Sequence, residues 1–487
     1  MAYGGGTFTS QNKTLPGAYI NFVSTSSSTV NLFGSRGTVA VALPIATPDG
    51  KVLEWTVDDF KTKCNEFFGI PWNSTDTTAT NYSTVQMLRE IFCNASKVIV
   101  AGGLNGLSGK YSTGSNDYVS VTSNVAGDYN NYKISLYGTK LASGIYNFGI
   151  ILYSPSGVEI VQKAGNENTL DESIEYAVKG INSAQNIFTF TAKKGAPDYE
   201  NLGSNAFTTS GGESISLTTS NAFDQHKQAL AALSKKPFNI LICNTYNGET
   251  DLNACSTTDY LKDLYHEFTR KQREELGVKF QTVYYDFLNT QGGSGEAVNS
   301  EYAISVKNDK DAIFWVGGAL AGASFNESLC NKTYDGELTF DADISAEELK
   351  EAIEEGSFIF HTVGDEVRVM DDINTYVEDT TETKNKAVDI FNDNQSIRII
   401  DQIGNDVATI FIDNFLGKVS ATPEGRAAFW SSIVDYHEQM QNLGGITNFT
   451  SGNIQVLEGE ARNSVIVNEV ITLASSMKKL YMQVTVQ

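Results

Sequence analysis

The sequence predicts a multidomain protein of the α+β or α/β class, with α/β core domains, one inserted all-β domain and an extended β-strand arm at each end. Strand-like apolar runs alternate with helical patterns over residues 25–107 and 202–345, which is typical of an α/β fold. Residues 108–201 differ, because Gly, Ser, Asn, Thr and Tyr dominate and short strand-like runs follow one another between turns. Both ends of the chain carry extended runs with strand-like patterns.

The length of 487 residues is enough for about three domains. The composition shifts along the chain divide it into six parts. In order, these are an N-terminal linking arm at 1–24, a first part of the α/β core at 25–107, an inserted β-rich outer domain at 108–201, a second part of the core at 202–345, a C-terminal domain at 346–463 and C-terminal linking strands at 464–487.

The N-terminal arm contains three glycines at Gly4–Gly6 and a Pro-Gly turn signal at Pro16-Gly17. The run after this turn, Ala18–Ser24, is strand-like. The residues that we expect to carry the contacts of this arm are Thr7, Phe8, Thr9, Pro16, Gly17, Tyr19, Ile20 and Phe22.

The first part of the core contains a buried strand at Thr38–Leu43, and helical spacing of apolar residues follows at Val57–Phe68. A second helix is predicted at Thr84–Phe92 and a strand at Lys97–Ala101, so the order suggests an α/β unit. In the insert, the predicted strands are Tyr118–Thr122, Tyr132–Leu136, Tyr146–Tyr153, Glu159–Gln162 and Ile187–Thr191.

The second part of the core alternates in the same way, which favours a sheet with crossover helices. Helices are predicted at Ala222–Leu233 and at Thr257–Leu276, where Gly277 ends the second one. The predicted strands are Phe238–Cys243, Lys279–Asp286 and Asp311–Val316.

The C-terminal domain opens with a capped helix at Ser345–Glu355, in which Ser345 is the N-cap and Glu348 completes a capping box. A hairpin at Phe358–Val363 and Glu366–Met370 follows. The remaining predicted elements are a helix at Ile397–Ile412, a helix from Pro423 to Leu443 with Pro at its first position, and a strand at Ile454–Leu457.

The chain then closes with two extended runs, Ser464–Leu473 and Lys479–Gln487. Strict alternation in the second run predicts a half-buried strand. The contact residues expected in this arm are Val465, Val467, Leu480, Tyr481, Met482, Val484 and Val486. A terminal strand needs a partner for its backbone edges, and this partner lies either in the same chain or in a neighbouring copy.

The net charge of −23 argues against a nucleic-acid partner, because such affinity comes mainly from Lys and Arg on phosphates. It also disfavours an anionic membrane. The N-terminus lacks the pattern of a signal peptide, and the longest apolar stretch, Ala312–Ala323, is too short to span a bilayer. We therefore expect folding in a cytoplasm.

The sequence offers no local pattern for a catalytic, cofactor or metal site. The glycine-rich stretch GLNGLSGK at Gly103–Lys110 departs from a Walker loop at its first glycine and at the residue after the lysine, Tyr111. The histidines and the dispersed cysteines lack metal or redox spacing, and we expect packed or surface roles for them. Adjacent acids such as Asp371-Asp372 are interpreted as solvated faces.

Several stretches, taken in order, resemble the contractile tail sheath proteins of myophages and phage-tail-like bacteriocins, in the form found in phage-like elements of Gram-positive hosts. The resemblance spans nearly the whole chain except the insert, and its strength lies in the order of the motifs. The stretches are GGTFTSQNKTLPGAYINF (Gly5–Phe22), RGTVAVALP (Arg36–Pro44), LREIFCNASKVIV (Leu88–Val100), FWVGGALAGAS (Phe314–Ser324), DDINTYV (Asp371–Val377), SIRIIDQIGNDV (Ser396–Val407), LGKVSATPEGRAAF (Leu416–Phe429) and MKKLYMQVTV (Met477–Val486).

The resemblance implies a structural protein without enzymatic activity, metal or cofactor. Sheath subunits of this family stack as hexameric rings around a tail tube, exchange terminal strands with neighbouring subunits and contract to drive the tube through a cell envelope. Its implied partners are further copies of the chain, the tail tube protein, and the baseplate and tail terminator proteins, with assembly in the host cytoplasm. The resemblance also implies that the helix at Glu424–Leu443 faces the tube, with Glu424, Arg426, Asp435 and Glu438 as candidate contacts.

Two other functions remain open from the residues alone. Alternating strands and helices at Phe238–Val316 would suit a small-molecule enzyme, although this argument rests on fold analogy. The Ser-, Thr-, Gly- and Tyr-rich insert would suit a static β-rich surface protein.

Overall fold

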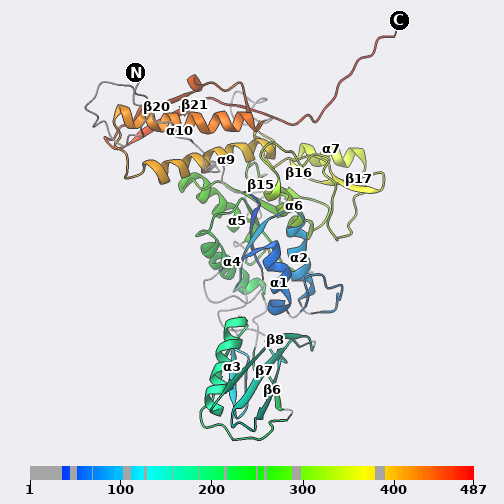
Figure 1. Ribbon diagram of the computed structural model, residues 1–487. Coiled ribbons are helices and arrows are strands. Elements are labelled where there is room, and N and C mark those ends of the chain that lie inside the picture. Colours follow the sequence, from blue (N-terminus) through cyan, green and yellow to red (C-terminus); the bar gives the residue numbers. More distant parts are fainter. Residues whose placement is uncertain are drawn as a thin grey trace, which may run out of the picture. The chain divides into compact units, whose positions relative to one another are not determined.

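The computed structural model describes most of the chain (Figure 1). The described residues are 36–43, 52–68, 70–79, 81–102, 111–124, 129–155, 157–185, 187–203, 205–212, 217–247, 250–256, 260–287, 298–378 and 390–486. The N-terminal linking arm predicted at 1–24 and the stretch Gly103–Lys110 lie outside these residues.

The chain divides into two compact units. The larger unit contains Arg36–Gly404, Met440–Phe449 and Ile471–Gln487. The smaller unit contains, among the described residues, Asn405–Gln439 and Thr450–Val470.

The centre of the larger unit is a seven-stranded sheet. All neighbouring strands in it are parallel except β2 and β3, which are antiparallel. In spatial order the strands are β16 (Ser357–Phe358), β15 (Ala303–Val306), β14 (Gln281–Tyr285), β11 (Ile240–Ile242), β1 (Thr38–Ala42), β3 (Lys97–Ala101) and β2 (Val52–Thr56). The predicted strands around β1, β3, β11 and β14 are confirmed, whereas β2, β15 and β16 come in addition.

Alternation along the central strand assigns its side chains to two different cores. Val39 and Val41 of β1 belong to a core that also contains residues of α1, α2 and α6, whereas Ala40 and Ala42 belong to a core with residues of α4 and α5. The sheet is therefore covered by helices on both faces, as in other α/β folds. The helices are α1 (Val57–Phe68), α2 (Tyr82–Phe92), α4 (Thr219–Leu233), α5 (Leu261–Arg270), α6 (Ala312–Gly322) and α7 (Ala346–Glu354), and a π-helical turn at Lys271–Glu275 continues α5.

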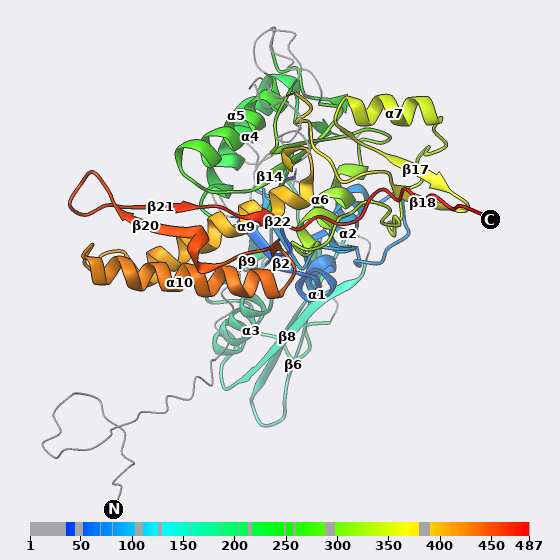
Figure 2. The same cartoon turned by 90° about the horizontal axis from the view of Figure 1, so that it is seen from above.

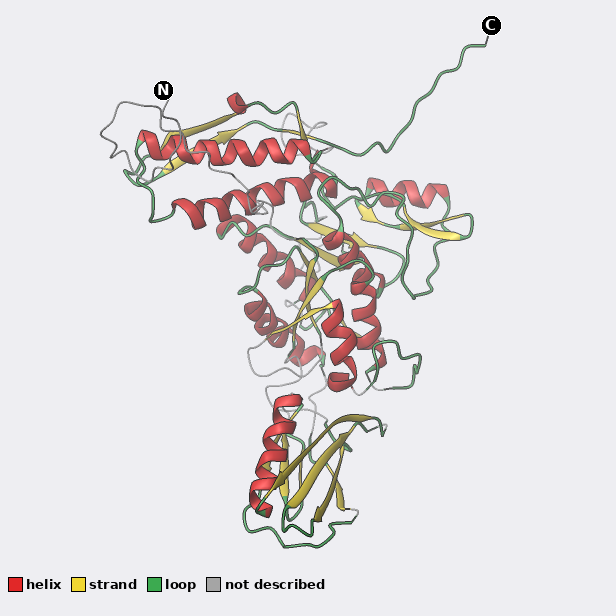
Figure 3. Cartoon of the chain, viewed as in Figure 1, coloured by secondary structure: helices red, strands yellow, loops and turns green. Residues whose placement is uncertain are grey.

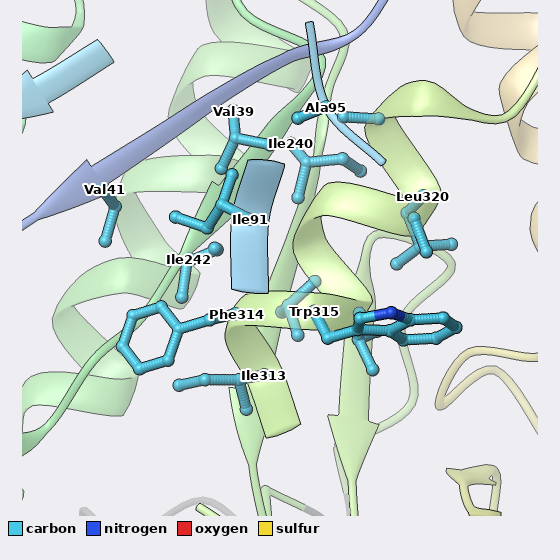
Figure 4. Close-up of a cluster of buried hydrophobic side chains, with 14 of the residues drawn as sticks. Val39, Val41, Ile91, Ala95, Ile240, Ile242, Ile313, Phe314, Trp315 and Leu320 are labelled. Atoms are coloured by element: carbon cyan, nitrogen blue, oxygen red, sulfur yellow. The ribbon is translucent and has the colours of Figure 1, made fainter. Parts of the chain in front are cut away.

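The predicted strand at Asp311–Val316 is wrong, because these residues begin the helix α6. Every residue from Ala312 to Ala321 is buried, so the helix has no polar face that would reveal its period. Figure 4 shows side chains of α6, among them Phe314, packed among residues of β1, β11 and α2. A short apolar run fits a buried strand and a buried helix equally well in sequence, which explains the error.

The insert has a core of its own, but it is not all-β as the sequence predicted. Its strands form a three-stranded sheet and a four-stranded sheet. The first consists of β4 (Thr113–Ser115), β5 (Val119–Ser123) and β9 (Phe188–Ala192), and the second of β10 (Asn205–Thr208), β6 (Lys133–Lys140), β7 (Tyr146–Tyr153) and β8 (Glu159–Glu167), each in spatial order. Since β10 pairs with β6, the fold of the insert continues beyond Asn201.

The helix α3 (Leu170–Ala184) is the element that the all-β interpretation missed (Figure 3). It buries Leu170, Ile174, Ala177 and Ile181 in the core of the insert, which is the spacing of one helix face. The Thr169 hydroxyl accepts the Glu172 N–H at 3.3 Å and caps the first turn. The helical spacing of these apolar residues is visible in the sequence, but the prediction relied on the Gly, Ser, Asn, Thr and Tyr content of the whole insert.

Short strands complete the larger unit. The predicted hairpin is confirmed as β17 (Phe360–Val363) and β18 (Glu366–Val369), and α7 has the predicted capping box between Ser345 and Glu348. The other pairs are β12 (Tyr246–Asn247) with β13 (Thr250–Asp251), and β19 (Ile446–Thr447) with β22 (Thr472–Leu473).

Two long helices connect to the smaller unit. They are α9 (Asn394–Ile410) and α10 (Pro423–Asn442), and both confirm the helices predicted there. A π-helical turn at Phe411–Phe415 follows α9, and a 3-10 turn at Ser451–Asn453 precedes the hairpin of β20 (Ile454–Glu458) and β21 (Val465–Glu469). This hairpin runs alongside α10 (Figure 2).

Candidate assembly surfaces

The C-terminal segment is attached to the larger unit as far as Lys478. Leu473 and Thr472 of β22 pair with β19, and the Ala474 N–H donates to the carbonyl oxygen of Gly445 at 3.0 Å. Two residues further on, the Ser476 N–H donates to the side-chain oxygen of Gln395 at 3.0 Å. Gln395 is buried in the first turn of α9, so the segment is held against a rigid element.

Lys478 makes the last contact of this attachment. Its ammonium lies 2.6 Å from a carboxylate oxygen of Asp371 and 2.9 Å from one of Asp393. Burial works against the charge of Lys478, but Asp393 and Asp371 outweigh it and raise the lysine pKa above its usual value. The other oxygen of Asp393 accepts the N–H and hydroxyl of Ser396 at 2.8 Å each. We call Lys478, Asp371 and Asp393 the lysine clamp.

A buried ion pair lies next to the clamp. Asp372 and Arg398 are 2.7 Å apart, and their side chains are 0% and 2% exposed. Asp372 also accepts hydrogen bonds from the Leu329 N–H at 2.9 Å and from the Asn394 amide at 3.1 Å. Burial works to raise the pKa of Asp372, but Arg398 outweighs burial and the pKa is lowered.

Asp371 and Asp372 are thus not the solvated pair that the sequence suggested. Asp372 is fully buried, and Asp371 is held in the clamp. The charges that compensate them, Lys478 and Arg398, lie far away in the sequence, which local pattern reasoning does not see. Both of these partners fall within stretches that carry the family resemblance.

Beyond the clamp, the chain runs on as an extended segment with no helix or strand beside it in Figure 1. Within the described part of the chain, nothing pairs with residues 479–486. The predicted half-buried strand therefore lacks a partner in a single copy. All of its apolar residues are strongly exposed: Leu480 86%, Tyr481 89%, Met482 76%, Val484 69% and Val486 88%.

Val465 and Val467 are placed differently from these residues. Both lie in β21, opposite Glu458 and Val456 of β20, and both are half-buried. The predicted contact residues of the C-terminal arm are therefore divided between a hairpin within the chain and an exposed segment. Among the described residues no third strand pairs with this hairpin, so its outer backbone edges are open.

The hairpin is fixed to α10 through polar contacts. The indole N–H of Trp430 donates to the carbonyl oxygen of Ile454 at 2.9 Å. The buried ring of His437 lies 3.4 Å from the Glu469 carboxylate. On the opposite face of the hairpin, Leu457 and Ile466 are directly paired and 46% and 44% exposed.

The candidate tube-facing residues of α10 occupy two sides of the helix. At about 100° per residue, positions 424, 435 and 438 lie within roughly 60° of one another, and position 426 lies on the opposite side. Glu424, Asp435 and Glu438 are exposed. Arg426 instead pairs with Glu458 of the hairpin at 3.6 Å, and this contact separates it from the acidic face.

Hydrogen bonds at the start of α10 lower the pKa of one of these acids, Glu424. The backbone N–H of Glu424 and the hydroxyl of Thr422 both lower the pKa of the Glu424 carboxyl. Glu424, Asp435 and Glu438 form an exposed face, here called the acidic face of α10.

The histidines, cysteines and acids of the described residues are dispersed over the fold. No group of three or more His, Cys, Asp or Glu among them is arranged to hold a metal ion. A cavity of about 400 Å³ is lined by residues 322, 323 and 326–332 with Asn94 and Ser476, and no histidine lines it. His226 and His437 are buried, His266 stacks on Tyr302 with 5.3 Å between ring centres, and His361 lies half-buried in β17. No helix of the described residues is long and apolar enough to cross a membrane.

Comparisons with known proteins agree with this geometry. Residues 219–375 match the model of the phage tail sheath protein central domain, and residues 387–487 match that of the phage tail sheath C-terminal domain. The chain is similar to the phage-like element PBSX protein XkdK of Bacillus subtilis, with 26% identity over 514 residues and 99% of each chain covered. It is also similar to the uncharacterized protein YqbK of that organism, with 27% identity over 525 residues that cover 99% of this chain and 100% of YqbK.

Two solved structures share the fold. The sheath tail protein of Listeria innocua superposes with a TM-score of 0.70 and 22% identity over 92% of this chain and 94% of that one. The sheath tail protein of Desulfitobacterium hafniense gives a TM-score of 0.66 and 22% identity over 96% and 99%.

Proposed function

Since this chain belongs to the phage tail sheath family, we propose that it polymerises as stacked hexameric rings around a tail tube, linked by exchanged terminal strands. Contraction of this polymer would drive the tube through the envelope of a target cell. The role is structural rather than enzymatic, and assembly takes place in the host cytoplasm before the tail or tail-like particle is released.

The observation that carries this proposal is the extended segment beyond the lysine clamp. Its apolar side chains alternate with mostly polar ones, and its backbone has no partner among the described residues. Eight extended residues span roughly 26 Å, which is enough to cross a small sheet of another subunit. The open edges of the β20–β21 hairpin are a suitable receiving surface, because they need backbone hydrogen bonds from a further strand.

A strand that each copy donates to the next makes a heterologous contact, and heterologous contacts propagate into rings or helices rather than closed dimers. The N-terminal arm, with Thr7 to Phe22, would supply a second link of this kind. Two links per subunit would allow neighbours to slide while they remain connected.

Electron microscopy of the purified protein tests the proposal. We expect tubes from the full chain and none from a chain that ends at Lys478, which keeps the clamp but lacks the exposed segment. Replacement of Leu480, Met482 and Val484 by Ser is the milder variant, since it keeps the backbone and removes the apolar contacts. Tubes of normal length from the truncated chain would contradict strand exchange by the C-terminal segment.

We further propose that the acidic face of α10 points toward the tail tube. The support is the separation of Glu424, Asp435 and Glu438 from the side of α10 that holds the hairpin. Neutralisation of the three acids to Gln, Asn and Gln should leave polymerisation of the sheath intact and weaken its co-assembly with the tube protein, measured by co-sedimentation.

A matched control uses the exposed acids of α7. Glu347, Glu351 and Glu354 are also exposed on a helix, and their change to Gln removes the same charge. Equal loss of tube binding in both triple variants would show that net charge, and not the acidic face of α10, is responsible.

Baseplate and tail terminator proteins would bind the two ends of the polymer.

A further inference from the structure

We infer that the lysine clamp marks the boundary between the part of the chain that stays on its own subunit and the strand that is donated. Lys478 is the last residue held by the larger unit, and the donated strand begins at Lys479. This inference rests on the proposed strand exchange, but the clamp itself is a property of the single chain and is tested separately.

The clamp is built to hold one ammonium group. Two carboxylates approach Lys478 within 2.9 Å, and the side chains of Asp371, Asp393 and Lys478 are 22%, 13% and 23% exposed. Ionic hydrogen bonds of this kind are short and strong, and partial burial protects them from screening by salt. Without Lys478, the two carboxylates would be left near each other without a counter-charge.

Each carboxylate is itself fixed by a rigid part of the larger unit. Asp393 uses its other oxygen to hold the first turn of α9 through Ser396. Asp371 accepts the N–H of its neighbour Asp372 at 2.8 Å, and Asp372 is locked to Arg398 of the same helix. The C-terminal segment is therefore attached to α9 through a continuous chain of hydrogen bonds and ion pairs.

The neighbouring residue shows the contrast. Lys479 carries the same charge one position later, but no carboxylate of the described residues pairs with it. From there on, every apolar residue is at least 69% exposed. Among the described residues, the polar contacts with the larger unit thus end at Lys478, and the exposed Met477 side chain just before it takes no part in them.

The pair of substitutions Lys478→Met and Lys479→Met tests the inference, since both remove one positive charge from adjacent positions. Hydrogen exchange reports the clamp, because the amides of Ala474 and Ser476 are hydrogen-bonded just before it. We expect K478M to lower the protection of these amides by roughly tenfold or more, because two charge-assisted hydrogen bonds are lost. K479M should leave it unchanged.

Electron microscopy of the same variants reports the donated strand. K478M should give few or no tubes, whereas K479M should give tubes like the unmodified chain. A triple variant, K478M with Asp371→Asn and Asp393→Asn, removes the unpaired carboxylates and keeps the test valid if K478M alone unfolds; it should be folded, unprotected at Ser476 and without tubes.

If the amides of Ala474 and Ser476 stay protected from exchange in K478M, or lose as much protection in K479M, Lys478 does not hold the segment. Normal tubes from a K478M protein that has lost protection would overturn its role as the boundary. Absence of tubes from the unmodified chain would refute the proposed function and with it the boundary, and the exchange data would then still decide whether the clamp holds the segment.

Discussion

Mild acid is expected to destabilise the larger unit through one buried histidine. His226 of α4 is 1% exposed, and its Nδ1 lies 2.9 Å from the Tyr265 hydroxyl. Its Nε2 is buried without a hydrogen-bond partner among the described residues. Burial lowers the pKa of His226 from 6.5 to about 4, because a charged ring would lose its hydration.

The direction and size of the effect follow from linkage. The folded-state pKa lies below the unfolded value, so the neutral ring contributes stability that is fully present above pH 6.5 and is lost as the pH falls toward 4. At about 1.4 kcal/mol per pH unit, the loss between pH 7 and pH 5 is about 2 kcal/mol, and it approaches about 3 kcal/mol below pH 4.

Urea unfolding at pH 7, 6 and 5 measures this loss. Three of the four tryptophans, Trp55, Trp72 and Trp315, lie in the larger unit, and Trp55 and Trp315 are 3% and 0% exposed in the core of the seven-stranded sheet, so tryptophan fluorescence mainly follows the unfolding of this unit. The comparison is with His226→Asn, whose amide can still bond the Tyr265 hydroxyl but does not titrate. We expect the variant to be less stable at pH 7, because Asn leaves space in the core.

The informative quantity is the difference in pH dependence between the two proteins. Other groups titrate in both chains and cancel in this difference, which we expect to be about 2 kcal/mol between pH 7 and pH 5. Equal pH dependence of the two proteins would refute the reasoning, since His226 would then be equally easy to protonate in the folded and unfolded chain.

Three further substitutions test the packing described above. Asp372→Asn leaves Arg398 buried without a counter-charge and should lower the free energy of unfolding by about 3–5 kcal/mol in urea titrations, and a loss under 1 kcal/mol would speak against the buried pair. Gly318→Ala places a Cβ 2.3 Å from the carbonyl oxygen of Ile91, so α6 and α2 must separate; we expect a loss of about 1–3 kcal/mol by thermal unfolding, and an unchanged midpoint would contradict it. Ser345→Ala removes the capping box of α7 and should cost about 1 kcal/mol locally, seen as faster amide exchange in the first turn of α7, whereas unchanged exchange would show that the cap is dispensable.

Most helices with a polar outer face were predictable from the sequence, with α3 as the exception, whereas the helix α6, which is buried on all sides, was not. The helix at Val57–Phe68 and the capped helix after Ser345 agree with the structure because polar residues mark their outer faces and ends. In α6 no polar residues mark an outer face, so the sequence does not distinguish a helix from a strand. The helix becomes evident only from its tertiary contacts, such as the close approach of Gly318 to α2.

Long-range charge pairs were also invisible to sequence reasoning. The acids Asp371 and Asp372 resemble surface residues until Lys478 and Arg398 are brought to them by the fold. By contrast, the alternation after Lys479 was recognised from the sequence, because a period of two is visible in neighbouring residues alone.

The position of the insert has a consequence for the order in which the chain folds during synthesis. Strand β1 pairs with β11, and Thr38 and Asn239 at the start of this pairing are 201 residues apart. At about 5–20 residues per second, a ribosome needs roughly 10–40 s to make the intervening chain, and the backbone edge of β1 that pairs with β11 stays open during that time.

The insert shortens this gap once it has folded. Its first and last strand ends meet, since Thr113 and Ser210 exchange backbone hydrogen bonds of 2.9 Å in both directions. A chain whose middle is already closed has far fewer free residues to bring together, so less entropy opposes the joining of β1 to β11. Replacement of the insert by another folded domain whose ends also meet should leave the rate at which β1 joins β11 unchanged. An unstructured linker of the same length should slow this step.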